Sequence, residues 1–179
     1  CIQSENRQGV EALTRHVLSM GHKKIAFVYG AEDTVSDIRL TTFLRTMNEA
    51  GLSVPDDYLV ASPYHDPAST REATAQLLAL ADRPTCILMP DDFSSIGGGN
   101  AIRRMGLRFP EDVSAAGYDG IQLASVTNPA MTTYRQDTAA LGKTAAAKLI
   151  ELIEKPRTAL VDRILIPGKL VEGCSVRAI

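Results

Sequence analysis

Apolar residues in the first two thirds of the chain recur with two alternating periods, one typical of helices and one of buried strands. Val10, Leu13 and Val17 recur at helical spacing near the start. This pattern predicts a helix over Arg7–Met20, and Gly21 follows where a left-handed helix cap is favoured.

The same alternation continues as far as residue 116. The other predicted helices are Arg39–Ala50, Thr70–Leu80 and Phe93–Met105, and the predicted strands are Ile25–Tyr29, Tyr58–Ala61, Cys86–Met89 and Val113–Ala116. Repeated alternation of this kind requires a parallel sheet with helices on both faces and right-handed crossovers. The sequence therefore predicts an α/β fold with a Rossmann-like sub-domain.

The last third of the chain shows a different pattern. A long helix is predicted over Ala139–Ile153, with an apolar inner side and Lys155-Pro156 at its end. Two short strands are predicted after it, at Ile164–Ile166 and Lys169–Val171.

The stretch Gly106–Gly120, read as GLRFPEDVSAAGYDG, joins a helix stop, a buried strand and an acidic loop. Gly106 ends one helix, Pro110 prevents its return, and the strand ends at Ala116. The chain is then expected to leave the sheet as a loop. Because such loops line the ligand crevice of an open parallel sheet, Asp119 is placed where a polar ligand could be bound.

Size and charge narrow the classes of function. A chain of 179 residues can bury roughly 70% of its unfolded surface, which suits one sizeable core. Its 19 basic and 21 acidic residues give a net charge of −2, so we expect no DNA binding from this piece. We also expect no membrane span and no signal peptide. The three cysteines are unpatterned and indicate a reduced, cytoplasmic protein, with Cys86 in the core.

Motifs for catalysis are missing from the sequence. His16, His22 and His65 lie in separate segments, and there is no G-x-S-x-G elbow, phosphate loop or metal-spaced histidine pair. The sequence therefore predicts no enzyme, no cofactor and no metal site.

Six segments, taken in order, resemble one known family. They are GHKKIAFVYG at Gly21, Arg39 followed by Phe43, GLSVP at Gly51, RPTCILMPDD at Arg83, GLRFPEDVSAAGYDG at Gly106, and PAMTTYRQD at Pro129. The chain resembles the effector-binding core of lactose-repressor and galactose-repressor transcriptional regulators, which share the fold of periplasmic sugar-binding proteins.

The resemblance implies a division of the chain. Residues 1–135 would form the C-terminal effector-binding sub-domain, 136–158 a crossover helix belonging to a missing first sub-domain, and 159–179 the return strands. It also implies a fragment that lacks the family's DNA-binding head. The apolar face of the crossover helix would then have lost its partner, so we expect self-association.

Candidate ligand-binding residues follow from chemistry and resemblance together. Sugar or nucleoside recognition needs charged planar groups that pair with neighbouring polar atoms. Arg39 matches an arginine that relatives place in the cleft, Asp91 falls where many relatives have a ligand-contacting asparagine, and Asp119 lies at the carboxyl edge. Asp92 is expected to be a helix N-cap.

Three further residues are weaker candidates. Tyr64 matches a position where some relatives place an aromatic against the ligand, but it is equally compatible with an exposed loop. Phe93 could stack on a ligand ring or cover the core. Gln136 matches the crossover position that often reaches the cleft.

One local conflict is the run Gly97-Gly98-Gly99 inside a predicted helix, because each glycine costs roughly 1 kcal/mol relative to alanine. Either the helix frays or begins late, or the glycines allow a close approach between helices. The resemblance places this helix at a dimer contact.

Together these features predict the ligand-sensing domain of a bacterial transcriptional regulator. A small effector, expected to be a carbohydrate, would bind in an inter-domain cleft and control DNA binding by a homodimer. The alternatives are a periplasmic sugar-binding protein of a transporter, a purine-sensing regulator and an α/β enzyme.

Overall fold

The computed structural model describes residues 1–30, 34–156 and 163–179. The α-helices are α1 (Asn6–Ser19), α2 (Thr34–Glu49), α3 (Pro67–Leu78), α4 (Asp92–Arg104) and α5 (Thr138–Glu154). The strands are β1 (Ile2–Ser4), β2 (Ile25–Tyr29), β3 (Leu59–Ala61), β4 (Cys86–Leu88), β5 (Ser114–Asp119), β6 (Thr132–Arg135), β7 (Ile164–Ile166) and β8 (Lys169–Val171). Two short 3-10 helices, η1 (Asp56–Tyr58) and η2 (Gln122–Ser125), complete the described elements.

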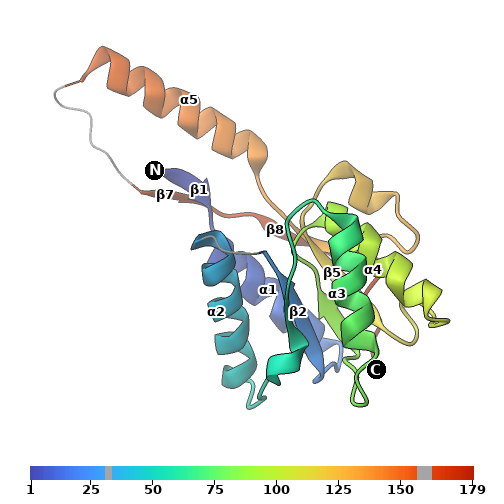
Figure 1. Ribbon diagram of the computed structural model, residues 1–179. Coiled ribbons are helices and arrows are strands. Elements are labelled where there is room, and N and C mark those ends of the chain that lie inside the picture. The colour runs from blue at the N-terminus through green and yellow to red at the C-terminus, as the bar shows by residue number, and fades with distance from the viewer. Residues whose placement is uncertain (31–33, 157–162) are drawn as a thin grey trace.

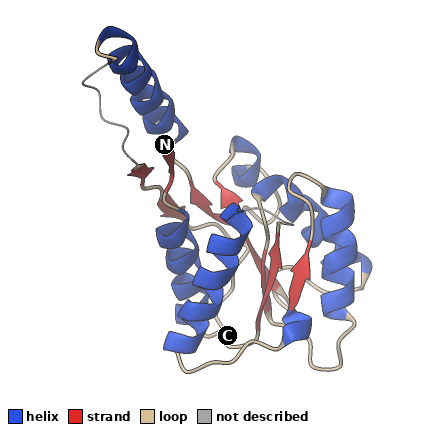
Figure 2. Ribbon diagram, turned by 60° about the vertical axis from the view of Figure 1, so that its left-hand side comes forward, coloured by secondary structure: helices blue, strands red, loops and turns tan. Residues whose placement is uncertain are grey.

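Six strands form the main sheet in the order β3-β2-β4-β5-β6-β8. All neighbouring pairs are parallel except β6 and β8, which run antiparallel. Helices cover both faces of the sheet (Figures 1 and 2). The predicted α/β architecture with a parallel sheet is therefore confirmed.

Two hydrophobic cores lie on opposite faces of the sheet, because successive residues of a strand point to opposite sides. Ile25 and Phe27 of β2 pack with α1 and α2, whereas Ala26 and Val28 pack with α3 and α4. Cys86, predicted to be a core residue, is fully buried beside the first pair of helices.

The glycine run lies within α4, and all three glycines are buried. A Cβ atom on Gly97 would lie 1.9 Å from the carbonyl oxygen of Pro67 at the start of α3. The glycines therefore allow a close approach between α3 and α4 within the chain, and the alternative of a frayed or late-starting helix is wrong.

Three elements stand apart from the main sheet, and we call them the arm: β1, α5 and β7. Strands β1 and β7 form a separate parallel pair, and α5 extends away from the rest of the molecule (Figure 1). None of the residues of α5 is buried, and Leu149 and Ile153 are 60% and 70% exposed. We call the main sheet and its covering helices the body. Three short segments connect the arm to the body: Glu5, Gln136-Asp137 and Pro167-Gly168.

The end of β5 differs from the prediction. The strand continues through Gly117 and Tyr118 to Asp119 rather than stopping at Ala116. The reason is β6, a strand that the sequence did not predict, which pairs with β5 as far as Asp119↔Arg135. The short strand β1 was not predicted either, and the predicted boundary between residues 158 and 159 lies outside the described residues.

Candidate functional site

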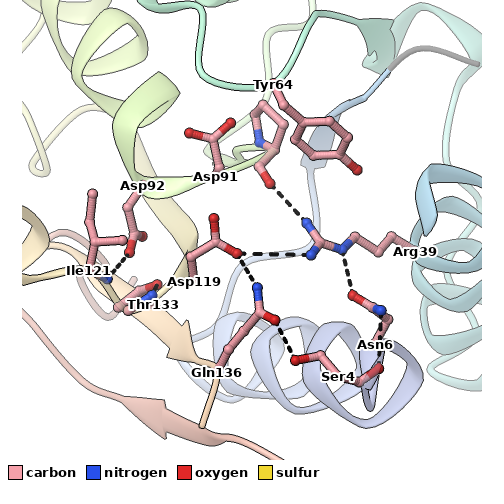
Figure 3. A network of polar contacts seen from close by, with 12 residues as sticks. Ser4, Asn6, Arg39, Tyr64, Asp91, Asp92, Asp119, Ile121, Thr133 and Gln136 are labelled. Atoms are coloured by element: carbon pink, nitrogen blue, oxygen red, sulfur yellow. Dashed lines mark hydrogen bonds and ion pairs between the residues drawn. The ribbon is translucent and has the colours of Figure 1, made fainter. Parts of the chain in front are cut away.

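The carboxyl ends of the parallel strands meet at one edge of the main sheet. Strand β2 lies between β3 and β4, so the order of the strands reverses there. In open α/β sheets, ligands bind outside the carboxyl ends at such a reversal. The side chains at this edge are therefore the candidate site (Figure 3).

Arg39 extends from α2 to the centre of this edge and is only 7% exposed. Its Nε donates to Oδ1 of Asn6 at 2.9 Å, and its Nη1 donates to the carbonyl oxygen of Pro90 at 3.0 Å. The guanidinium carbon lies 3.7 Å from the centroid of the Tyr118 ring. Contacts from α1, the end of β4 and β5 therefore hold the guanidinium in place.

Asp119 completes a polar chain across the edge. Its Oδ1 lies 4.0 Å from Nη2 of Arg39 and accepts a hydrogen bond from Nε2 of Gln136. Oε1 of Gln136 in turn accepts from the hydroxyl of Ser4. We call Arg39, Asp119, Gln136, Ser4 and Asn6 the polar cluster (Figure 3).

Burial sets the electrostatics of Asp119. Desolvation raises the pKa of its carboxyl group, while the nearby charge of Arg39 and the hydrogen bond from Gln136 lower it. The result is a partly shielded acceptor next to a fixed cationic donor, an arrangement suited to a ligand that both donates and accepts hydrogen bonds.

Asp91, and not Asp92, is the N-cap of α4. Asp91 is the N-cap, because its Oδ1 accepts from the backbone N–H of Ser94 at 2.7 Å. Its Oδ2 accepts from the Ser94 hydroxyl and from the backbone N–H of His65. The prediction that Asp92 is the N-cap is wrong, since the extended backbone that precedes the helix belongs to Asp91. Asp91 is 1% exposed, and its side-chain oxygens accept hydrogen bonds from Ser94 and His65 rather than from the polar cluster.

Asp92 is the first residue of α4 and is buried against β5. Its Oδ2 accepts from the backbone N–H of Ile121 at 2.9 Å, and its Oδ1 lies against Gly117. Desolvation raises the pKa of this carboxyl group to about 6, although Thr133 and the Ile121 N–H lower it. Asp92 therefore connects α4 to the loop that follows Asp119.

The two aromatic candidates lie at the border of the site. Tyr64 covers Gly30, its hydroxyl is 2.9 Å from the hydroxyl of Ser36, and its ring centroid is 5.7 Å from the guanidinium carbon of Arg39. Phe93 in the first turn of α4 is 41% exposed. Tyr64 thus packs beside Arg39, whereas Phe93 presents its ring to solvent.

Sequence reasoning missed several residues of this edge. Ser4 and Asn6 precede the first predicted helix and received no prediction, and Tyr118 was assigned to a loop. Tyr118 is buried, and its ring lies against the guanidinium of Arg39. The alternation of side chains along β5 could have indicated which way Tyr118 points, had the full length of the strand been known. His65, whose backbone N–H donates to Asp91, was considered only as one of three separate histidines.

A hollow of about 390 Å³ adjoins the polar cluster. It lies where β6 leads into α5 and is lined by residues 135–139 and 167–169, including Gln136. Within the described residues, no group of histidine, cysteine and acidic side chains is placed to hold a metal ion. None of the described helices has the length and apolar character needed to cross a bilayer.

Comparison with known proteins places this geometry in context. The profile of the periplasmic binding protein-like domain matches residues 14–176. The HTH-type transcriptional repressor PurR of Salmonella paratyphi B is 35% identical over 163 residues, which cover 90% of this chain and 47% of the repressor. The chain thus spans about half the length of the curated relatives that it matches.

Solved structures show the same fold. The lac repressor dimer bound to operator and the anti-inducer ONPF is 26% identical, with a TM-score of 0.89 over 99% of this chain and 52% of that one. The complex of the transcriptional regulator CelR with cellobiose is 25% identical, with a TM-score of 0.90 over 97% of this chain and 53% of that one.

Proposed function

We propose that this chain, which belongs to the periplasmic binding protein-like domain family in its LacI/GalR-type regulator branch, binds a small effector at the polar cluster and thereby controls DNA binding by a cytoplasmic transcriptional repressor. DNA would be contacted through residues outside this chain. The similarity to repressors supports this function over a transport protein or an enzyme.

The observation that carries the proposal is the fixed pairing of Arg39 with Asp119. Asn6, Pro90 and the Tyr118 ring hold the guanidinium, so little side-chain entropy remains to be lost when a ligand binds. Nη2 offers a donor within 4.0 Å of a carboxylate acceptor. One ligand bearing an acceptor and a donor on adjacent atoms would engage both, with Gln136 at the side.

Two classes of ligand fit this pairing. We propose a carbohydrate, because two neighbouring hydroxyl groups can accept from Arg39 and donate to Asp119, and CelR, a neighbour in fold, is complexed with cellobiose. An oxopurine is the second candidate, because the C=O and N–H of its cyclic amide present the same pattern and the relatives include PurR.

We further propose the boundaries of the functional parts. The main sheet and its helices, within residues 5–135 and 167–179, form one wall of the effector cleft, and the arm carries the chain into the second wall. The exposed apolar stripe of α5 supports this division, because such a stripe usually marks a packing surface.

A homodimer is the proposed assembly, with an apolar patch at η2 as the contact between copies. The patch comprises Ile121, Leu123, Val126 and Phe93, of which Val126 is 74% exposed. Packing of two such patches would cover apolar surface that water now contacts. The operator-bound lac repressor is a dimer.

Isothermal titration of the purified protein with cellobiose and with hypoxanthine tests the site. Arg39→Ala should weaken binding of the accepted ligand by about 30-fold or more, because a charge-assisted hydrogen bond is lost. Arg45→Ala on the same helix is the matched control, since Arg45 is exposed and pairs with Glu11. Equal affinities of the Arg39 and Arg45 variants would remove the site assignment, and failure of both ligands to bind wild type would reject cellobiose and hypoxanthine as its ligands.

A further inference from the structure

Asp119 reaches the polar cluster through an unusual backbone conformation. Its φ is 102°, in the left-handed region that residues with a side chain rarely adopt. A conformation of this kind persists only where the surrounding contacts enforce it. The contacts of the turn that begins at Asp119 therefore determine where its carboxylate lies.

Strand β6 and the residue after it fix the start of this turn. The carbonyl oxygen of Asp119 accepts from the backbone N–H of Gln136 at 3.1 Å. The next N–H, that of Gly120, donates to the hydroxyl oxygen of Thr133 at 3.3 Å. Gly120 has a φ of 68°, and a Cβ atom there would collide with Arg135. The turn thus runs directly against β6 as far as Gly120.

Asp92 fixes the end of the turn from the side of α4. Its Oδ2 accepts from the backbone N–H of Ile121 at 2.9 Å. Asp92 is 3% exposed, and its Oδ1 occupies the space that a Cβ atom on Gly117 of β5 would need. In Figure 3 the carboxylate points toward Ile121 and Thr133 and away from Arg39. Asp92 therefore contacts the turn rather than the open side of the polar cluster.

We propose that Asp92 is a positioning residue for effector recognition. By holding Ile121, it keeps Asp119 in the conformation that places the carboxylate beside Arg39. This inference rests on the proposed function of the polar cluster as an effector site. It predicts that effector affinity depends on a hydrogen-bond acceptor at position 92 and not on a negative charge there.

Two substitutions separate the hydrogen bond from the charge. Asp92→Asn removes the charge but keeps an oxygen that can accept from the Ile121 N–H, whereas Asp92→Ala removes both. Burial raises the pKa of Asp92 to about 6, so this residue is ionised in wild type at pH 8. At pH 8, titration calorimetry of the purified protein with cellobiose and with hypoxanthine should give Asp92→Asn an affinity within about threefold of wild type. For the ligand that binds, the affinity of Asp92→Ala should be about tenfold lower.

A double-mutant cycle distinguishes positioning from general damage to the fold. If Asp92 acts through Asp119, then Asp92→Ala should lower affinity by less than about twofold in an Asp119→Ala background. Damage that spreads through the fold would lower affinity by the same factor in both backgrounds. Ser95→Ala is the matched control and should bind as wild type does. Ser95 is buried on the same helix, and its hydroxyl donates to the carbonyl oxygen of Asp91.

Hydrogen exchange of the Ile121 amide measures the same contact in the absence of any ligand. Asp92→Ala should speed this exchange by about tenfold or more, because the N–H loses its buried acceptor. Asp92→Asn and Ser95→Ala should leave the exchange close to that of wild type. Nuclear magnetic resonance of the free protein measures all three rates.

The outcomes separate the inference from the function on which it rests. Equal affinities of Asp92→Ala and Asp92→Asn, equal losses in both backgrounds of the cycle, or an Ile121 amide that exchanges alike in both variants would each overturn the positioning role and leave the effector site standing. Failure of wild type to bind either ligand would instead reject both ligands, and with them the role of Asp92 in recognising them, whatever the exchange of Ile121 shows.

Discussion

The pair α3–α4 and the helix α5 arise from similar amphipathic patterns but end in opposite environments. Helices α3 and α4 approach so closely that glycines are needed between them, whereas α5 has no buried residue. An apolar stripe on a helix thus predicts that the helix packs against another surface, but it does not predict which surface that is. In the body the partner is the sheet and a neighbouring helix. In the arm, the described element that α5 contacts most is the short strand β1.

The largest expected difference between the two regions comes from truncating one leucine in each. Leu77 of α3 is fully buried, so Leu77→Ala should lower the free energy of unfolding by about 2–5 kcal/mol. Leu149→Ala on α5 should change it by less than about 0.5 kcal/mol, as is usual for an exposed position. Urea denaturation of both variants measures this contrast. A loss at Leu149 that approaches the loss at Leu77 would show that α5 is packed in solution.

A glycine substitution in each region sharpens the same comparison. Gly97→Ala places a Cβ atom against the Pro67 carbonyl and should destabilise the fold by about 1–3 kcal/mol or more, because α3 and α4 must separate. Gly142→Ala in α5 meets no atom within 4 Å and should stabilise by up to about 1 kcal/mol through helix propensity. Melting temperatures that shift in the same direction for both variants would contradict the difference in packing.

The smallest effect concerns charge rather than packing. The raised pKa of Asp92 means that its ionised form disfavours the folded state, so this cost is absent below about pH 4 and fully present above about pH 6. Asp92→Asn should therefore stabilise the protein at pH 8 by roughly 1–2 kcal/mol, and the gain should vanish at pH 4. The control is Asp137→Asn, which exchanges one good N-cap residue of the exposed helix for another. A gain for Asp92→Asn that is the same at both pH values would refute the electrostatic origin.

Periodicity predicted the body of the fold because burial imposes a repeat on every helix and strand. The helix over Arg7–Met20 and the strand Ile25–Tyr29 correspond closely to α1 and β2. Strand β6 escaped prediction, because its four residues carry too little pattern to distinguish a strand from a crossover. The extent of β5 then escaped as well, since its last residues are strand only by virtue of pairing with β6.

The site was harder to predict from the sequence than the fold. A shift of one residue in a strand or at a helix boundary changes which side chains reach the site. Asp119 was found as an acidic residue at a strand edge, whereas Arg39 and Gln136 were found by resemblance, and the structure brings the three together. The N-cap of α4 shows the limit, since Asp91 and Asp92 can both cap a helix and only the backbone conformation decides which of them does. Asn6 could not be assigned because its role depends on a residue 33 positions away.

Because only three short segments connect the arm to the body, a small rotation at the base of α5 would move its far end by a larger distance. Helix α5 has 17 residues and is therefore about 25 Å long at 1.5 Å per residue. A rotation of about 10° at its base would move the far end by roughly 4 Å, a leverage that follows from this helical rise. Gln136 lies just before α5 and bonds to Asp119, so a rotation of the backbone at this residue would displace the tip of α5 more than its base.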